Sequence, residues 1–136
     1  MGRIGAMHYQ QGNLDKARTI FEGLVELDPF SGDARSALGA VLTLQQEDEL
    51  AEQHLLKAVE IDPEGIAPHV NLGEVFIRRQ RIEDALVHLR KAIELDPNET
   101  DPGANRARAM VLGIYQLIQL ENGQSPEIHQ ESDKIN

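Results

Sequence analysis

Apolar residues recur with a helical period along most of the chain, and short polar breaks separate the periodic segments. In one pair of segments the apolar positions are Leu38, Val41 and Leu42 and, after polar residues 45–48, Leu55, Ala58 and Val59. Spacings of i, i+3 and i+4 place side chains on one face of an α-helix. The pattern therefore predicts two antiparallel helices joined by a short turn.

The same pattern returns every 34 residues. Proline, glycine and alanine each recur at this interval, at Pro29, Pro63 and Pro97, at Gly5, Gly39 and Gly73, and at Ala17, Ala51 and Ala85. Each unit also ends on Glu-Leu-Asp-Pro or Glu-Ile-Asp-Pro. A fixed period of this length is the signature of a repeat protein, in which each unit is one helix pair.

Local residues mark where the helices stop and start. In the first unit, Gly12 supplies a helix stop, and the side-chain oxygen of Asn13 is expected to accept from the free N–H groups of the next helix. The Asp-Pro pairs close the second helix of each unit, because proline cannot continue a helix. The repeated glycines are expected to face the repeated alanines and to let the two helix axes approach closely.

These motifs resemble the tetratricopeptide repeat family over residues 1–99. The family's Leu-Gly and aromatic positions match Leu38-Gly39, Leu72-Gly73 and Phe76, and its Ala, large, Ala and Pro positions match Ala51, Leu55, Ala58 and Pro63 and Ala85, Leu89, Ala92 and Pro97. Unit one keeps Gly5, Ala17, Phe21 and Pro29, but Leu24 replaces the second Ala. The resemblance implies an all-α solenoid with repeats at about 1–31, 32–65 and 66–99. Met1 falls inside the first helix, which leaves open whether the natural N-terminus lies upstream.

In this family the first helices line a concave groove, so the resemblance implies a non-catalytic module, an adaptor or assembly scaffold, that binds a protein partner there. By analogy the groove-lining residues are Ala6, Tyr9, Gln10, Ser36, Ala37, Ala40, Thr43, Leu44, Val70, Asn71, Glu74, Ile77 and Arg78. Some members hold a carboxylate with groove cations, but the equivalent positions here, Gly2, Ala6, Ala37, Ala67 and Asn71, carry none.

An alternative is a looser resemblance to the cytoplasmic chaperones of type III secretion translocators. It rests on three repeats, a long apolar C-terminal helix, acidic charge and the runs Leu27-Asp28-Pro29, Ala34-Arg35 and Leu38-Gly39-Ala40. Those chaperones hold an unfolded segment in the groove, and the resemblance implies the same role here.

A longer helix is predicted at about 102–121, beginning at Asp101-Pro102, where an acid caps the helix and proline takes its first turn. Its apolar residues sweep roughly 220° of the helical wheel, more than one packed neighbour needs. We expect it to cap the repeats and to offer a second interface, including Leu112 and Tyr115, to a homodimer partner, the groove or a client. Residues 1–121 then form one domain, and 122–136 a flexible polar tail.

Composition narrows the function classes. The 136 residues carry a formal net charge of −10 and no cysteine. Nucleic-acid binding is disfavoured, because it needs clustered Lys and Arg, and thiolate chemistry is excluded. No segment approaches the ~20 apolar residues of a membrane span, and the N-terminus lacks the apolar core of a signal peptide. We expect a cytoplasmic protein without membrane insertion.

Candidate chemistry is sparse. His54 and His88 are equivalent in successive units, but two histidines alone do not make a metal site, so neither a metal nor another cofactor is expected. Glu74 lacks the partner residue that a general base needs, and no catalytic residue is assigned. The acidic run 47–49 with Glu52 and the basic residues Arg78, Arg79 and Arg81 are expected to be solvated turn residues, or else opposite patches that attract other molecules.

Overall fold

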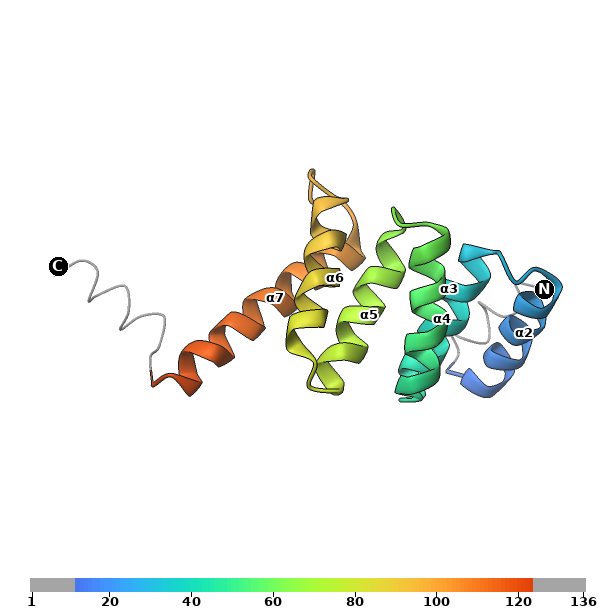
Figure 1. Ribbon diagram of the computed structural model, residues 1–136, viewed down its shortest axis with the longest axis horizontal. Coiled ribbons are helices and arrows are strands. Elements are labelled where there is room, and N and C mark those ends of the chain that lie inside the picture. Colours follow the sequence, from blue (N-terminus) through green and yellow to red (C-terminus); the bar gives the residue numbers. More distant parts are fainter. Residues whose placement is uncertain (1–11, 124–136) are drawn as a thin grey trace, which may run out of the picture.

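The computed structural model describes residues 12–123, which form six α-helices and no strand (Figure 1). The helices are α2 (Leu14–Leu27), α3 (Gly32–Leu44), α4 (Asp48–Ile61), α5 (Ile66–Arg78), α6 (Ile82–Glu94) and α7 (Pro102–Glu121). Three predicted groove residues, Ala6, Tyr9 and Gln10, lie outside the described residues, as does the predicted tail from residue 124 onward.

Side-chain caps begin three of these helices. Asn13, Ser31 and Asp101 each accept a hydrogen bond from the backbone N–H three residues further on. These bonds satisfy donors that the first helical turn leaves free. The expected cap at Asn13 is thus confirmed, and Gly12 before it has a φ of 77°, a left-handed conformation that glycine adopts at little cost.

The helices stack as antiparallel pairs into an elongated solenoid. α3 packs against α4 and α5 against α6, while α2 lies beside α3 as the second helix of the preceding unit (Figure 1). One continuous core runs through the stack, and its largest fully buried side chains include Leu38, Leu42, Leu55, Leu72 and Leu89. The predicted all-α repeat architecture is confirmed.

In each complete helix pair, a glycine of the first helix packs against a leucine of the second helix. A Cβ built on Gly39 would stand 2.5 Å from Cγ of Leu55, and one on Gly73 would stand 2.5 Å from Cγ of Leu89. The expectation that these glycines face the repeated alanines is therefore wrong, because the nearest side chain lies four residues further along the second helix. A bare glycine receives a large leucine, and the two helices interdigitate.

The alanine of the second helix has a packing constraint of its own. Ala51 on α4 is fully buried, so Ala51→Leu adds three heavy atoms to a filled core. We expect a loss of roughly 1–3 kcal/mol in the free energy of unfolding, measured by urea denaturation. Gln53→Leu, at an exposed position of the same helix, serves as the control. An unchanged melting temperature for Ala51→Leu would contradict this packing.

α7 takes the place of the first helix of a fourth unit. It packs against α5 and α6 as α5 packs against α3 and α4. Its N-cap is offset, because the first-helix N-caps fall at Ser31, Gly65 and Asp101, so the last interval is 36 residues instead of 34. The third residue after each N-cap is buried in all three helices, as Ala34, Pro68 and Ala104.

A buried carboxylate fastens the loop between α6 and α7. Asp96 accepts from the backbone N–H groups of Thr100 and Asp101 and from the guanidinium of Arg108, whose Nη1 lies 3.0 Å from Oδ2. Burial opposes ionisation of Asp96, but these hydrogen bonds outweigh it and hold the pKa below its ordinary value. The ionised Asp96 thus ties the start of α7 to the end of α6.

Candidate protein-binding surface

The first helices α3 and α5 pack side by side, and the side chains they turn away from α4 and α6 form one surface. We call it the first-helix face. Leu44 is 51% exposed there, and six other predicted groove residues are partly exposed: Ser36, Ala37, Ala40, Asn71, Glu74 and Ile77. The structure therefore brings most of the described candidates onto two adjacent helices.

Two predicted groove residues are buried, and their assignment is corrected. Thr43 donates from its hydroxyl to the carbonyl oxygen of Gly39 at 2.7 Å, which satisfies the hydroxyl inside the core. Val70 is covered by the start of α7, where Gly103 would place a Cβ 3.8 Å from a Val70 methyl group. Neither side chain offers contact area to a partner.

Arg78 reaches the first-helix face but has internal partners. Its guanidinium forms an ion pair with Asp48 and donates to the carbonyl oxygen of Thr43 at 2.8 Å. Glu52 likewise pairs with Arg79 and Arg81, at 3.3 and 2.8 Å. The three arginines are solvent-exposed, as expected for turn residues, but their charges are balanced by Asp48 and Glu52 within the chain.

Asn71 and Glu74 lie one turn apart on α5. The side-chain oxygen of Asn71 accepts from Arg106 of α7 at 3.3 Å, which links the first-helix face to the last helix. Glu74 is partly exposed between Asn71 and Arg78, both of which form hydrogen bonds to other residues. Asn71 and Arg78, the polar neighbours of Glu74 on α5, are thus engaged elsewhere, and Glu74 is available for contact with a partner protein.

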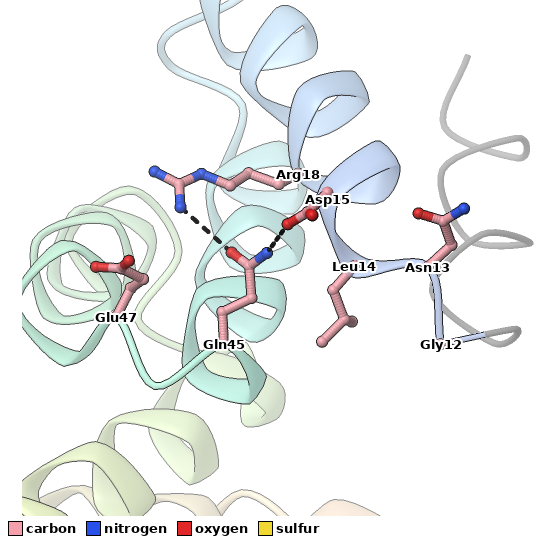
Figure 2. Close-up of a pocket in the computed structure, with 7 residues that line it drawn as sticks. All are labelled: Gly12, Asn13, Leu14, Asp15, Arg18, Gln45 and Glu47. Atoms are coloured by element: carbon pink, nitrogen blue, oxygen red, sulfur yellow. Dashed lines mark hydrogen bonds between the residues drawn. The ribbon is translucent and has the colours of Figure 1, made fainter.

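Two hollows lie near the N-terminal end of this surface. A 370 Å³ hollow between α2 and α3 includes Ala37 of the first-helix face and has mainly apolar walls, with Phe21, Leu24 and Leu27 among them. A second hollow of 670 Å³ lies at the turn end and is polar. There Gln45 donates to Asp15 at 2.8 Å and accepts from Arg18 at 3.3 Å (Figure 2).

The histidines form half-buried contacts that link first and second helices. His69 of α5 and His88 of α6 place their Nδ1 atoms 3.0 Å apart, and His69 Nε2 lies 2.9 Å from the Pro63 carbonyl oxygen. One unit earlier, Arg35 and His54 make the equivalent contact at 3.1 Å. Burial lowers the pKa of His54, His69 and His88. An alignment of the units would have revealed that these two contacts are equivalent, because Arg35 and His69 are 34 residues apart, as are His54 and His88.

The two residues proposed for a second interface on α7 have different environments. Tyr115 is 41% exposed, and its hydroxyl accepts a hydrogen bond from Arg90 of α6. It therefore lies on the side of α7 that faces the repeats. Leu112 is 59% exposed.

Within residues 12–123, no group of three or more histidine, aspartate or glutamate side chains is placed to hold a metal ion. Among the described helices, none has the length and hydrophobicity of a membrane span.

The stacked helix pairs and the shared first-helix face define a helical-repeat protein of the solenoid class. Two models of the tetratricopeptide repeat family match the chain, over residues 7–66 and 67–99, and together cover about two thirds of it. The chain belongs to the tetratricopeptide repeat family.

The curated type IV pilus assembly protein PilF of Pseudomonas aeruginosa is 33% identical over 57 residues, which are 42% of this chain and 23% of PilF. The chain thus spans about a quarter of the length of that relative.

Solved structures match over more of the chain. The Yersinia enterocolitica type III secretion translocator chaperone SycD has a TM-score of 0.78 at 21% identity, covering 84% of this chain and 80% of that chain. PcrH, in complex with the chaperone binding region of PopD, has a TM-score of 0.76 at 23% identity, covering 83% and 86%. The Arabidopsis OM64 TPR domain has a TM-score of 0.73 at 20% identity, covering 82% and 91%. At these identities the similarity is one of fold.

Proposed function

We propose that the protein is a non-catalytic adaptor that binds an extended or helical segment of a partner protein on its first-helix face. The observation that carries this proposal is the pairing of α3 and α5, which presents Ser36, Ala40 and Ile77 on a preformed and largely uncharged surface. A preformed receptor loses little conformational entropy on binding, so more of the interaction energy is retained as affinity.

The distribution of charge supports a segment that is not strongly acidic. Arg78 is engaged by Asp48 and Arg106 by Asn71, whereas Glu74 is partly exposed on α5 between Asn71 and Arg78. The formal net charge of −10 would also repel an acidic partner. Asn71 and Ala37 take positions where a carboxylate-binding groove would carry cations, which argues against a terminal carboxylate as the anchor.

A second candidate function is a chaperone for type III secretion translocators. The similarity of fold to SycD and PcrH supports it, since solved structures of both contain a bound translocator segment, a YopD peptide in SycD and the chaperone binding region of PopD in PcrH. The match to PilF instead favours a role in assembly. The similarity to an O-GlcNAc transferase reaches only 18% of that chain and supports no activity here.

An affinity capture from the native host tests the adaptor proposal. We expect Ala40→Arg on α3 to reduce capture of the bound partner by about tenfold, because a long charged side chain then occupies the centre of the first-helix face. Leu44→Arg provides a second variant at a more exposed position, and Gln53→Arg on α4 is the control that adds the same charge elsewhere.

The identity of the captured protein separates the candidates. One abundant secreted protein favours the chaperone, whereas several subunits of one complex favour an assembly scaffold. Full capture by both Ala40→Arg and Leu44→Arg, with native circular dichroism, would refute binding on the first-helix face. A hydrolase activity that Glu74→Gln abolishes would overturn the non-catalytic assignment.

A further inference from the structure

α7 carries apolar side chains on two separate faces. One face is buried against the repeats through Ala104, Ala107 and Ile114. Another face leaves Leu117 and Leu120 exposed, at 63% and 61%. Exposed leucines that lie together on one helix form an apolar patch, and such patches mark contact sites for other molecules.

The spacing of residues along this exposed face is symmetric about its central residue. The face consists of Arg106, Ala109, Gly113, Leu117 and Leu120, which we call the α7 stripe. Its spacings are 3, 4, 4 and 3 residues, which keep all five side chains on one side of the helix. The stripe therefore has Gly113 at its centre, Arg106 and the small Ala109 on the N-terminal side, and Leu117 and Leu120 on the C-terminal side.

In a second α7 that runs antiparallel across the stripe, the two Gly113 residues meet at the two-fold axis. Leu117 of each copy then packs against the small Ala109 of the other, and Leu120 packs beside the aliphatic stem of Arg106. A Cβ built on Gly113 would have no atom within 4 Å, so this position offers open space for the close approach of another helix. An interface of this kind is isologous, because the same patch is used on both subunits.

The repeats of this chain already use the same packing. Gly39 receives Leu55 and Gly73 receives Leu89, each from an antiparallel helix. Ala109 is the eighth residue after its N-cap, as Gly39 and Gly73 are after theirs. The third residue beyond that position is buried in the complete units, as Leu42 and Phe76, but exposed on α7, as Leu112. α7 thus presents the surface that a second helix covers elsewhere in the stack.

We propose that the α7 stripe binds a second copy of this chain, with the two α7 helices antiparallel about a two-fold axis at Gly113. In this arrangement Arg106, which also donates to Asn71 of its own chain, lies opposite Leu120 of the second copy and near the acidic Glu121 that follows it, so the charges at the two ends are complementary. A contact between a single pair of helices is small for a protein interface, so we expect a reversible dimer with a dissociation constant on the order of 10 µM.

Sedimentation velocity from about 1 to 300 µM brackets that dissociation constant and tests the dimer. Leu117→Glu should weaken association at least about tenfold, since two buried carboxylates would face alanine without a partner. Val87→Glu on α6 is the matched control, because Val87 is also 63% exposed and lies outside the stripe. A monomer at every concentration, or a dimer that loses stability equally in both variants or in neither, would overturn the proposal.

Crosslinking tests the two-fold axis. The chain has no cysteine, so Gly113→Cys introduces a single thiol at the proposed axis. A disulfide needs Cα atoms about 4.4–6.8 Å apart, which an antiparallel pair provides only close to its axis. Mild oxidation should yield a covalent dimer of Gly113→Cys, whereas Val87→Cys should remain monomeric. Efficient crosslinking of Val87→Cys without crosslinking of Gly113→Cys would refute the arrangement.

Discussion

Gly73→Ala is expected to destabilise the protein by about 3 kcal/mol, although alanine is the better helix former. The new methyl group would stand 2.5 Å from Cγ of Leu89, far inside van der Waals contact. Leu89 is fully buried and holds the third helix pair together, so it cannot rotate away without opening the core. Urea denaturation measures the loss as a lower midpoint with an unchanged slope.

A second glycine provides the control for this prediction. Gly113 is also interior to a helix, but an added Cβ meets no atom within 4 Å. Gly113→Ala should therefore stabilise the protein by about 0.5–1 kcal/mol through helix propensity alone. Measurements at low micromolar concentration keep association from contributing. Equal effects of the two substitutions would mean that the contact between Gly73 and Leu89 is not tightly packed.

The period of 34 residues predicted the helix pairs because it recurs in glycine, alanine and proline together, and each of these has a distinct steric role. It could not predict which side chain meets each glycine, since Ala51 and Leu55 lie one turn apart on the same face of α4. The 34-residue pattern also could not predict that α7 begins two residues late. Two additional residues in the preceding loop change the register of α7, and only the Asp96 contacts show how that loop folds.

The candidate site was predicted less completely than the fold. The resemblance to the repeat family placed Ser36, Ala40 and Ile77 on the first helices, and these side chains are partly exposed there. Burial of Val70 depends on the approach of α7, and capture of Arg78 depends on Asp48 in the neighbouring turn. Such contacts join residues about 30 or more positions apart, so they follow from tertiary packing and not from spacing within one helix.

Acidification below about pH 6.5 is expected to lower the free energy of unfolding. Burial holds the pKa values of His54, His69 and His88 below the ordinary value of 6.5, so the folded state favours their neutral forms. A depressed pKa adds stability that is fully present above the pKa of the unfolded chain and is lost as the pH falls through the folded value. The contributions of the three histidines have the same sign and therefore add.

Neighbouring charges modify this effect without reversing it. Lys91 opposes protonation of His69 and Asp62 favours it, Asp84 favours protonation of His88, and for His54 the charges of Arg35 and Arg18 oppose that of Glu22; burial outweighs the net effect in each case.

The contact between His69 and His88 adds a geometric limit. The Pro63 carbonyl can only accept, so Nε2 of His69 carries a proton and its Nδ1 accepts from Nδ1–H of His88. The pair can take up one further proton, on Nε2 of His88, without losing this contact. A second would set two N–H groups against each other at 3.0 Å and break the contact.

Urea denaturation at pH 7.5, 6.5 and 5.5 measures the expected decline. His88→Phe removes one titrating group and the geometric limit on the pair, so the decline should become shallower. The triple variant His54→Gln, His69→Gln and His88→Phe should show almost no decline above pH 5. The pKa of Asp96 lies below its ordinary value of 3.8, so Asp96 takes up its proton only at lower pH. An undiminished decline in the triple variant would show that other groups control the acid response.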